Sequence, residues 1–188
     1  MPMLFDLPAR HGSPTKLTDL TPAERFVVRA FRRWVAAMGG PEMSAHGAVA
    51  WNDFARGFGT ADGKVALSAF VAMVHGIARA ARRPIRCHRP CCLGLSADEL
   101  WIVRLTSAGQ AADHALASIL SCWLVAPAGQ DDVVRNAIVF GGLLSRHGYD
   151  LPSRRRTGND AGPTPRPVLA DFVEPPAKFN AKGAKQYH

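Results

Sequence analysis

Apolar side chains recur at helical spacing along most of the chain, and the first such stretch covers residues 21–38. Its apolar positions are Phe26, Val27, Ala30, Phe31, Trp34, Val35 and Met38, and its arginines are Arg25, Arg29, Arg32 and Arg33. The arginines gather on the face opposite the apolar one. The sequence "TPAE" at 21–24 matches a capping box with proline at the first helical position, and a Gly-Gly-Pro run follows residue 38. We therefore predict an amphipathic helix with a basic outer face.

Two further helices are predicted between residues 48 and 83, separated by the helix-breaking sequence "GTADG" at 59–63. The first, over about 48–58, presents Trp51, Phe54 and Phe58 at helical spacing. The second, over 64–83, is apolar around most of its circumference. Its one narrow polar stripe consists of Lys64, Ser68, His75, Arg79 and Arg82. A helix this apolar belongs at the centre of a bundle.

Three more helical patterns follow, over 97–110, 112–127 and 130–148. Ser96 and Glu99 form a second capping box, and Gly148 suits a C-cap. The pair Gly141-Gly142 inside the last pattern indicates either a close helix contact or a break. Together these patterns predict an all-α fold: a single-domain helical bundle of about six helices over residues 21–151, with a cysteine-containing inter-helix loop.

The two ends of the chain differ from the predicted bundle. Residues 1–20 are predicted to be a flexible arm, and residues 152–188, rich in proline and glycine, a disordered basic tail. From residue 153 the tail holds seven basic and three acidic residues, so it carries +4 of the chain's net charge of +8. Within it, "VLADFVEPP" at 168–176 has an i, i+4 apolar pattern suited to docking on the bundle or on a partner.

The charge of +8, on 188 residues with a pI near 9.9, favours an acidic partner: an acidic protein, nucleic acid or an anionic membrane. The longest apolar stretch, "ALASILSCWLVAPA", falls short of the roughly 18 apolar residues typical of a membrane span. The N-terminal residues lack the basic region of a secretory signal. We therefore expect a cytoplasmic protein without a membrane span.

The stretch "RRPIRCHRPCC" at 82–92 concentrates candidate chemistry. Its four soft or borderline ligands are Cys87, His88, Cys91 and Cys92. The C-x3-C spacing of Cys87 and Cys91 offers two thiolates, half of a zinc site, which His88, Cys122, His114 or His147 would have to complete. Iron–sulfur ligation is less well matched, because two of the cysteines are adjacent and diverge.

Two other interpretations of the same stretch stay open. In a redox interpretation, the surrounding arginines lower the thiol pKa and Cys87 with Cys91 form a reversible pair. In the interpretation that we favour, the cysteines only pack as small apolar residues.

The arginines provide the candidate surface for an acidic partner or for phosphate. They are Arg25, Arg29, Arg32 and Arg33 of the first helix, Arg82, Arg83, Arg86 and Arg89 around the cysteines, and Arg154, Arg155 and Arg156 of the tail. The apolar 64–83 helix lacks the base-reading side chains of a recognition helix, so nucleic acid is second to a protein partner.

The sequence lacks the phosphate-loop, zinc-protease and serine-hydrolase motifs. The expected function is therefore that of a non-enzymatic accessory or regulatory protein that binds an acidic partner protein through its basic faces and its tail. The alternative is a metal- or redox-responsive nucleic-acid-binding regulator that uses the 87–92 loop. A thiol-dependent enzyme is the third interpretation.

Overall fold

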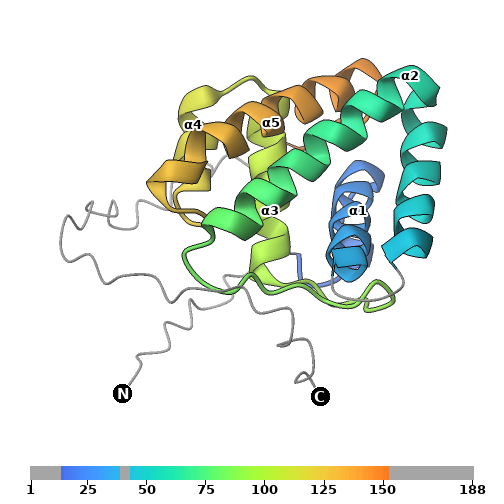
Figure 1. Ribbon diagram of the computed structural model, residues 1–188, viewed down its shortest axis with the longest axis horizontal. Helices are drawn as coiled ribbons and strands as arrows, with labels where there is room; N and C mark the ends of the chain where they lie inside the picture. Colours follow the sequence, from blue (N-terminus) through green and yellow to red (C-terminus); the bar gives the residue numbers. More distant parts are fainter. Residues whose placement is uncertain (1–13, 39–42, 153–188) are drawn as a thin grey trace.

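The computed structural model of the protein describes residues 14–38 and 43–152, and these form the predicted all-α bundle (Figure 1). The helices are α1 (Pro22–Met38), α2 (Met43–Ala80), α3 (Ala97–Gln110), α4 (His114–Ser121) and α5 (Pro127–Arg146). A short 3-10 turn, η1 (Leu17–Asp19), precedes them. One apolar core joins all five helices, with Phe54, Phe70, Phe140, Leu105 and Leu144 among its fully buried members.

Helix α1 begins where the capping box predicts. The Thr21 backbone N–H donates to the Glu24 carboxylate at 2.8 Å, and the Glu24 N–H donates to the Thr21 hydroxyl at 3.2 Å. Two of the N–H groups left over at a helix start are thereby satisfied. The helix ends at Met38, directly before the glycine pair.

Helix α2 is one continuous assignment with a sharp break inside it. Gly59 has a φ of 74° and a ψ of 175°, a conformation that side-chain-bearing residues rarely adopt, and the axis changes direction there (Figure 1). The two predicted helices therefore exist as two segments, α2a before Gly59 and α2b after it. The break is narrower than predicted, because residues 60–63 are helical. At the other end α2b stops at Ala80, so Arg82 lies in the following loop.

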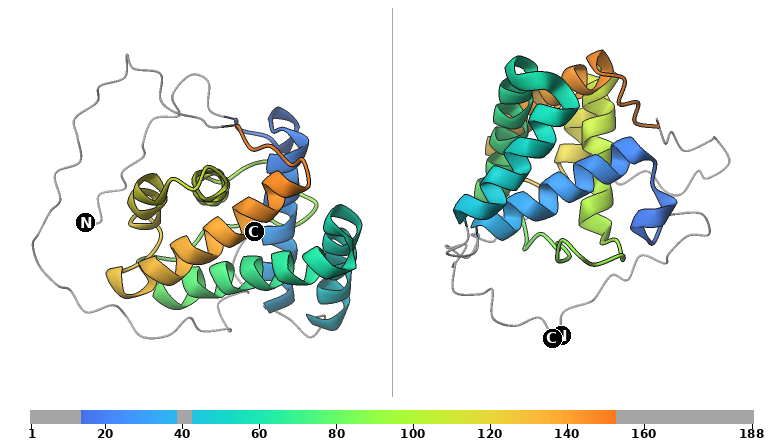
Figure 2. Two further views of the ribbon diagram at one scale, coloured as in Figure 1. Left: turned by 90° about the horizontal axis from the view of Figure 1, so that it is seen from above. Right: turned by 90° about the vertical axis from the view of Figure 1, so that its right-hand side faces the viewer.

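Helices α2b and α5 lie side by side and antiparallel (Figures 1 and 2). A Cβ added at Gly129 would overlap the Ala80 side chain, and at the other end His147 reaches Asp62 at 2.8 Å. Between these ends the Phe70 and Phe140 rings pack with centroids 5.3 Å apart. This aromatic packing supports the prediction that the most apolar helix is central.

Helix α3 crosses α5 at two glycines. A Cβ added at Gly109 would overlap the Ala137 backbone, and one added at Gly141 would overlap the backbone of Gln110. Gly142 has open space around it. Helix α5 runs unbroken through both glycines of the pair, so the close-contact interpretation of Gly141-Gly142 is correct and the break is not formed.

By length and composition, Gly47–Ala80 is the one helix in the described ranges that qualifies for a membrane crossing. Its axis breaks at Gly59, and Phe70, Met73 and Ile77 of its second half are buried in the bundle core. Core helices of soluble proteins meet the same length criterion. The fold is thus consistent with the predicted absence of a span.

The packed domain begins earlier than the predicted end of the N-terminal arm. Leu17 and Leu20 are buried, the Leu17 N–H donates to the Leu93 carbonyl at 2.8 Å, and the Leu95 N–H donates to the Thr15 carbonyl at 2.9 Å. Residues 14–20 therefore belong to the domain and pair with the cysteine loop. The predictions for residues 1–13 and for the tail, including Arg154, Arg155 and Arg156, lie outside the described residues.

Candidate functional site

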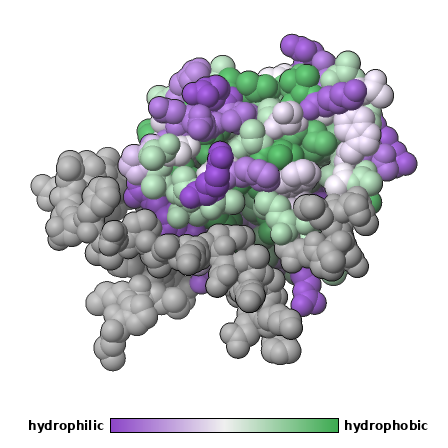
Figure 3. Space-filling view, viewed as in Figure 1, coloured by the Kyte–Doolittle hydropathy of each residue, from purple (hydrophilic) through white to green (hydrophobic). Residues whose placement is uncertain are grey.

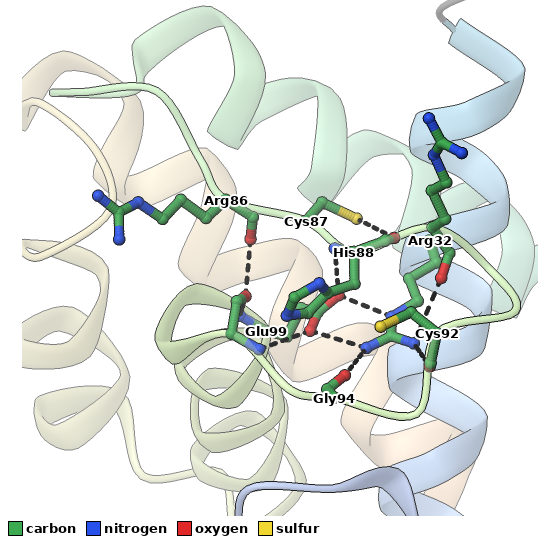
Figure 4. A network of polar contacts seen from close by, with 9 residues as sticks. Arg32, Arg86, Cys87, His88, Cys92, Gly94 and Glu99 are labelled. Carbon is green, nitrogen blue, oxygen red and sulfur yellow. Dashed lines mark hydrogen bonds and ion pairs between the residues drawn. The ribbon is translucent and has the colours of Figure 1, made fainter. Parts of the chain in front are cut away.

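The loop between α2 and α3, residues 81–96, is organised around a buried ion pair (Figure 4). Arg32 of α1 and Glu99 of α3 are each only 1% exposed. The Arg32 Nε donates to Glu99 Oε1 at 2.7 Å, and its Nη2 donates to Oε2 at 3.0 Å. The pair is bidentate, the geometry in which a guanidinium and a carboxylate bind most strongly.

The remaining donors of Arg32 hold the loop backbone. Nη1 donates to the Cys92 carbonyl and Nη2 to the Gly94 carbonyl, both at 2.5 Å (Figure 4). The prediction that Arg32 lies on a basic outer face is therefore wrong. Helical periodicity placed it opposite the apolar stripe, but a loop and a carboxylate from a distant part of the chain cover that position.

Glu99 also caps its own helix, as the second capping box predicts. The Ser96 N–H donates to Glu99 Oε2 at 2.8 Å, and the Glu99 N–H donates to the Ser96 hydroxyl at 3.1 Å. The His88 N–H adds a third donor at 2.9 Å. Burial alone raises the pKa of Glu99, but the hydrogen bonds from Arg32, Ser96 and His88 outweigh it and hold this pKa below its ordinary value.

The buried Asp98 also accepts hydrogen bonds from the loop. It accepts two hydrogen bonds from the Arg83 guanidinium, at 2.8 and 2.5 Å, and one from the Arg86 backbone N–H at 2.7 Å. Burial raises the pKa of Asp98, yet these donors bring it below its ordinary value. We call Arg32, Arg83, Asp98 and Glu99, with the loop backbone that they bind, the loop network.

The loop network raises the pKa of one thiol, whereas a redox site needs a thiol with a lowered pKa. Cys87 is half-buried, and burial together with the charge of Glu99 raises its pKa to about 12 despite the opposing influence of Arg32. The expectation that neighbouring arginines lower this pKa is therefore wrong for Cys87, because Glu99 neutralises Arg32 and burial disfavours the thiolate. Cys91 is exposed and Cys92 half-buried.

The predicted metal ligands come together only in part. A Cβ added at Gly94 would lie 3.7 Å from both Cys92 Sγ and His88 Nε2, so these two side chains converge. Two of the predicted completing residues lie elsewhere: His147 binds Asp62, and the Cys122 thiol contacts Gln130 at 3.4 Å. Within residues 14–38 and 43–152 there is no cluster of three or more histidine, cysteine or acidic side chains suited to a metal ion.

An open groove lies on the other side of α1, in the corner that it forms with the two segments of α2. Its volume is about 540 Å³, and sequence reasoning did not find it. Trp34 of α1, Trp51 of α2a and Leu67 of α2b supply apolar walls, and Lys64, His75 and Arg79 of α2b supply basic ones. Figure 3 shows apolar and hydrophilic side chains intermixed over α2. We call this feature the α1–α2 groove.

The charges of the α1–α2 groove are not neutralised by the described chain. Its lining includes no acidic residue, and Lys64, His75 and Arg79 form no ion pair with any described residue. The Trp34 ring packs against His75 with centroids 6.0 Å apart. The Trp34 indole N–H is the one buried side-chain donor in the described ranges without an acceptor. The predicted polar stripe of α2b is thus one wall of a groove whose opposite walls come from other helices.

The other predicted basic residues are distributed over the surface. Arg29, Arg82, Arg86 and Arg89 are exposed, and Arg25 and Arg33 are half-buried. Arg33 forms an ion pair with Asp53, and the Arg82 Nε donates to the Val125 carbonyl at 2.9 Å. Arg83 is committed to Asp98. The exposed arginines that keep their charge available in the loop are thus Arg86 and Arg89.

A second aromatic surface involves α3 and the end of α4. The Trp101 and Trp123 rings stack with centroids 5.8 Å apart and an interplanar angle of 18°, and the Arg104 guanidinium lies 5.3 Å from the Trp101 centroid. Trp123 is 48% exposed and the nearby helix α4 exposes Ile119. The Arg104 guanidinium already stacks on the Trp101 indole, whereas Lys64 and Arg79 of the groove have no ion pair in the described chain.

No family model, no curated protein and no solved structure matches this chain.

Proposed function

We propose that the protein is a non-enzymatic binding protein whose α1–α2 groove takes an acidic, amphipathic segment of a partner protein. The observation that carries this proposal is the combination of apolar and aromatic walls with three basic side chains and no lining acid. A helix in a groove buries its apolar face against such walls, and its flanking carboxylates meet the cations at the rim.

The length of the groove suits a peptide segment. Lys64 and Arg79 mark the two ends of the basic wall on one helix, and fifteen residues at about 1.5 Å each separate them by roughly 22 Å. That span matches about four helical turns of a ligand. A groove of this length, open to solvent, buries one face of a helix, whereas small-molecule sites enclose most of their ligand.

The indole N–H of Trp34 is a second feature through which ligand binding could lower the free energy of the protein. Its buried indole N–H lacks an acceptor, and a donor in that state costs about 1–3 kcal/mol relative to a satisfied one. A ligand that lets the ring shift toward a carboxylate or carbonyl oxygen recovers part of that cost. The fluorescence of Trp34 and Trp51 should therefore change on binding.

The test uses a fluorescein-labelled helical peptide of about 16 residues, with leucines on one face and glutamates beside them. The full chain should bind it, measured by fluorescence anisotropy, and a Lys64→Glu, Arg79→Glu variant should bind at least about tenfold more weakly, a loss of about 1.4 kcal/mol. The matched control is Arg86→Glu, Arg89→Glu, which makes the same charge change at exposed loop positions.

The control also separates the two basic regions. Weaker binding in the loop variant and unchanged binding in the groove variant would overturn the groove proposal and favour the loop arginines. A single-stranded oligonucleotide that binds more tightly than the peptide, with a steep dependence on salt, would instead favour the nucleic-acid alternative. A peptide with lysines in place of the glutamates should not bind.

A further inference from the structure

The tail contains a segment whose charge is opposite in sign to the net charge of the tail as a whole. Residues 153–188 carry a net charge of +4, but "VLADFVEPP" at 168–176 holds two acids and no base. If the segment were helical, the i, i+4 spacing would place Val168, Leu169, Phe172 and Val173 on one side of the helix, with Asp171 and Glu174 beside them. This is the chemistry that the proposed function assigns to the ligand of the α1–α2 groove.

The described chain ends close to the helices that wall the groove. Tyr149 packs against Phe26 of α1 and Phe58 of α2a, with ring centroids 5.4 Å apart in each case. Three residues later, the Pro152 carbonyl accepts a hydrogen bond from Ser107 at 3.3 Å. Tyr149 therefore contacts α1 and α2a, and Pro152, the last described residue, contacts α3.

The tether is long enough to reach any part of the groove. Sixteen peptide steps separate residues 152 and 168, which is at most about 55 Å when extended and about 22 Å for a flexible chain. The second value equals the estimated length of the basic wall. A tether of this kind gives the segment an effective concentration near about 1 mM at the groove.

Resting on the proposed function, we infer that residues 168–176 occupy the α1–α2 groove of their own chain and compete with the partner segment. Phe172 and Val173 would face Trp34, Trp51 and Leu67. Asp171 and Glu174 would meet the basic rim. The groove is favoured over the Trp101–Trp123 surface because its Lys64 and Arg79 form no ion pair in the described chain, whereas Arg104 is engaged with Trp101.

The test compares full-length chains in the anisotropy assay. An Asp171→Lys, Glu174→Lys variant and a Phe172→Ser, Val173→Ser variant should both bind the acidic peptide more tightly than the natural chain. If the segment alone binds with a Kd near 100 μM, the expected gain is about tenfold. Asp160→Lys, which changes a tail acid outside the segment, should have no effect. Equal affinities in all four chains would overturn the inference.

A direct measurement separates this inference from the proposed function. A synthetic peptide of residues 166–177 is titrated into the Phe172→Ser, Val173→Ser chain carrying Trp101→Phe and Trp123→Phe, so that only Trp34 and Trp51 report. A fluorescence change that Lys64→Glu, Arg79→Glu abolishes supports the inference, even if the designed peptide does not bind. Binding of the designed peptide without any response to the 166–177 peptide overturns the inference alone. If the tail weakens peptide binding more strongly at higher protein concentration, the segment binds the groove of another copy. That result would also overturn the inference that it binds the groove of its own chain.

Discussion

The loop network and the α1–α2 groove are both rich in basic side chains, but they use them in opposite ways. In the loop network Arg32 has four described oxygens around it at 3.0 Å or less, and Asp98 and Glu99 accept hydrogen bonds from the backbone N–H groups of Arg86 and His88. In the groove Lys64, His75 and Arg79 form no ion pair with the described chain. In the first region the charges are paired within the fold, and in the second they have no ion pair in the described chain.

The difference shows that a high density of cysteine, histidine and arginine in the sequence does not indicate which charged side chains remain without an ion pair. The loop attracts attention because cysteines, a histidine and arginines lie within eleven residues. Arg32 and Arg83 are nevertheless paired with Glu99 and Asp98, and the half-buried Cys87 has a raised pKa. In the sequence, the basic groove residues are ordinary members of an amphipathic helix. Only the tertiary structure places Trp34 and Trp51 in the same groove lining.

The largest effect should come from breaking the buried pair of the loop network. Arg32→Met leaves the Glu99 carboxylate buried without its partner, and we expect a loss of about 3–5 kcal/mol in the free energy of unfolding, measured by urea titration. Arg29→Met on the exposed side of α1 should change it by less than about 0.5 kcal/mol. Adding Glu99→Leu to Arg32→Met should recover part of the loss, and a single-variant loss under about 1 kcal/mol would mean that the network is not the organiser of the loop.

Thiol reactivity should differ sharply within the loop. With a pKa of about 12, Cys87 is about 0.01% thiolate at pH 8, so it should react with iodoacetamide on the order of 100-fold more slowly than the exposed Cys91. Peptide mass spectrometry over time measures both. Glu99→Gln should accelerate Cys87, because it removes a negative charge next to the thiol. Equal rates at Cys87 and Cys91 in the natural chain would contradict the raised pKa and the partial burial of Cys87.

Acid should destabilise the loop network before it affects the groove. Asp98 and Glu99 have folded-state pKa values below their ordinary values of 3.8 and 4.5, so their stabilisation is fully present above about pH 5 and is lost as the pH falls through the folded values. Each carboxylate contributes a slope of at most about 1.4 kcal/mol per pH unit. Urea midpoints between pH 7 and pH 3 should show this fall, and Asp98→Asn should reduce the slope. A profile that Asp98→Asn leaves unchanged would assign the acid sensitivity to other carboxylates.

The smallest effect on folding should come from the groove. Lys64→Ala and Arg79→Ala remove charges that lack ion pairs in the described chain, so each should change the free energy of unfolding by less than about 0.5 kcal/mol. Relief of repulsion between like charges would make the change slightly favourable. Thermal denaturation followed by circular dichroism checks this, and a loss above about 1 kcal/mol would show that the groove cations stabilise the fold as the loop network does.

Much of the helical framework was predictable, because its signals are local. Capping boxes at Thr21 and Ser96, the glycine after α1 and the positive φ of Gly59 act within a few residues of their own positions. The close contact at Gly141 was predictable only as an alternative, since periodicity does not show which helix crosses there. Helix α5 begins at Pro127, three residues before the predicted start at 130. Proline at the first position of a helix is the local signal for this earlier start.

The candidate site was predictable only in its parts. The stripe that contains Lys64, His75 and Arg79 is visible in the sequence, but the walls opposite it come from α1 and α2a and depend on the angle at Gly59. For the same reason Arg32 was misplaced: its position on α1 was correct, and the carboxylate that buries it is 67 residues away.

The sequence by itself determined the all-α class, the starts of α1 and α3, the break at Gly59 and the net positive charge, since each depends on composition or on neighbours within one or two turns. Only the tertiary structure decided which basic side chains are neutralised and which remain available, because an ion pair depends on distances between residues far apart in the chain. That packing places Arg32 in the interior beside Glu99, and leaves Lys64, His75 and Arg79 along an open apolar groove.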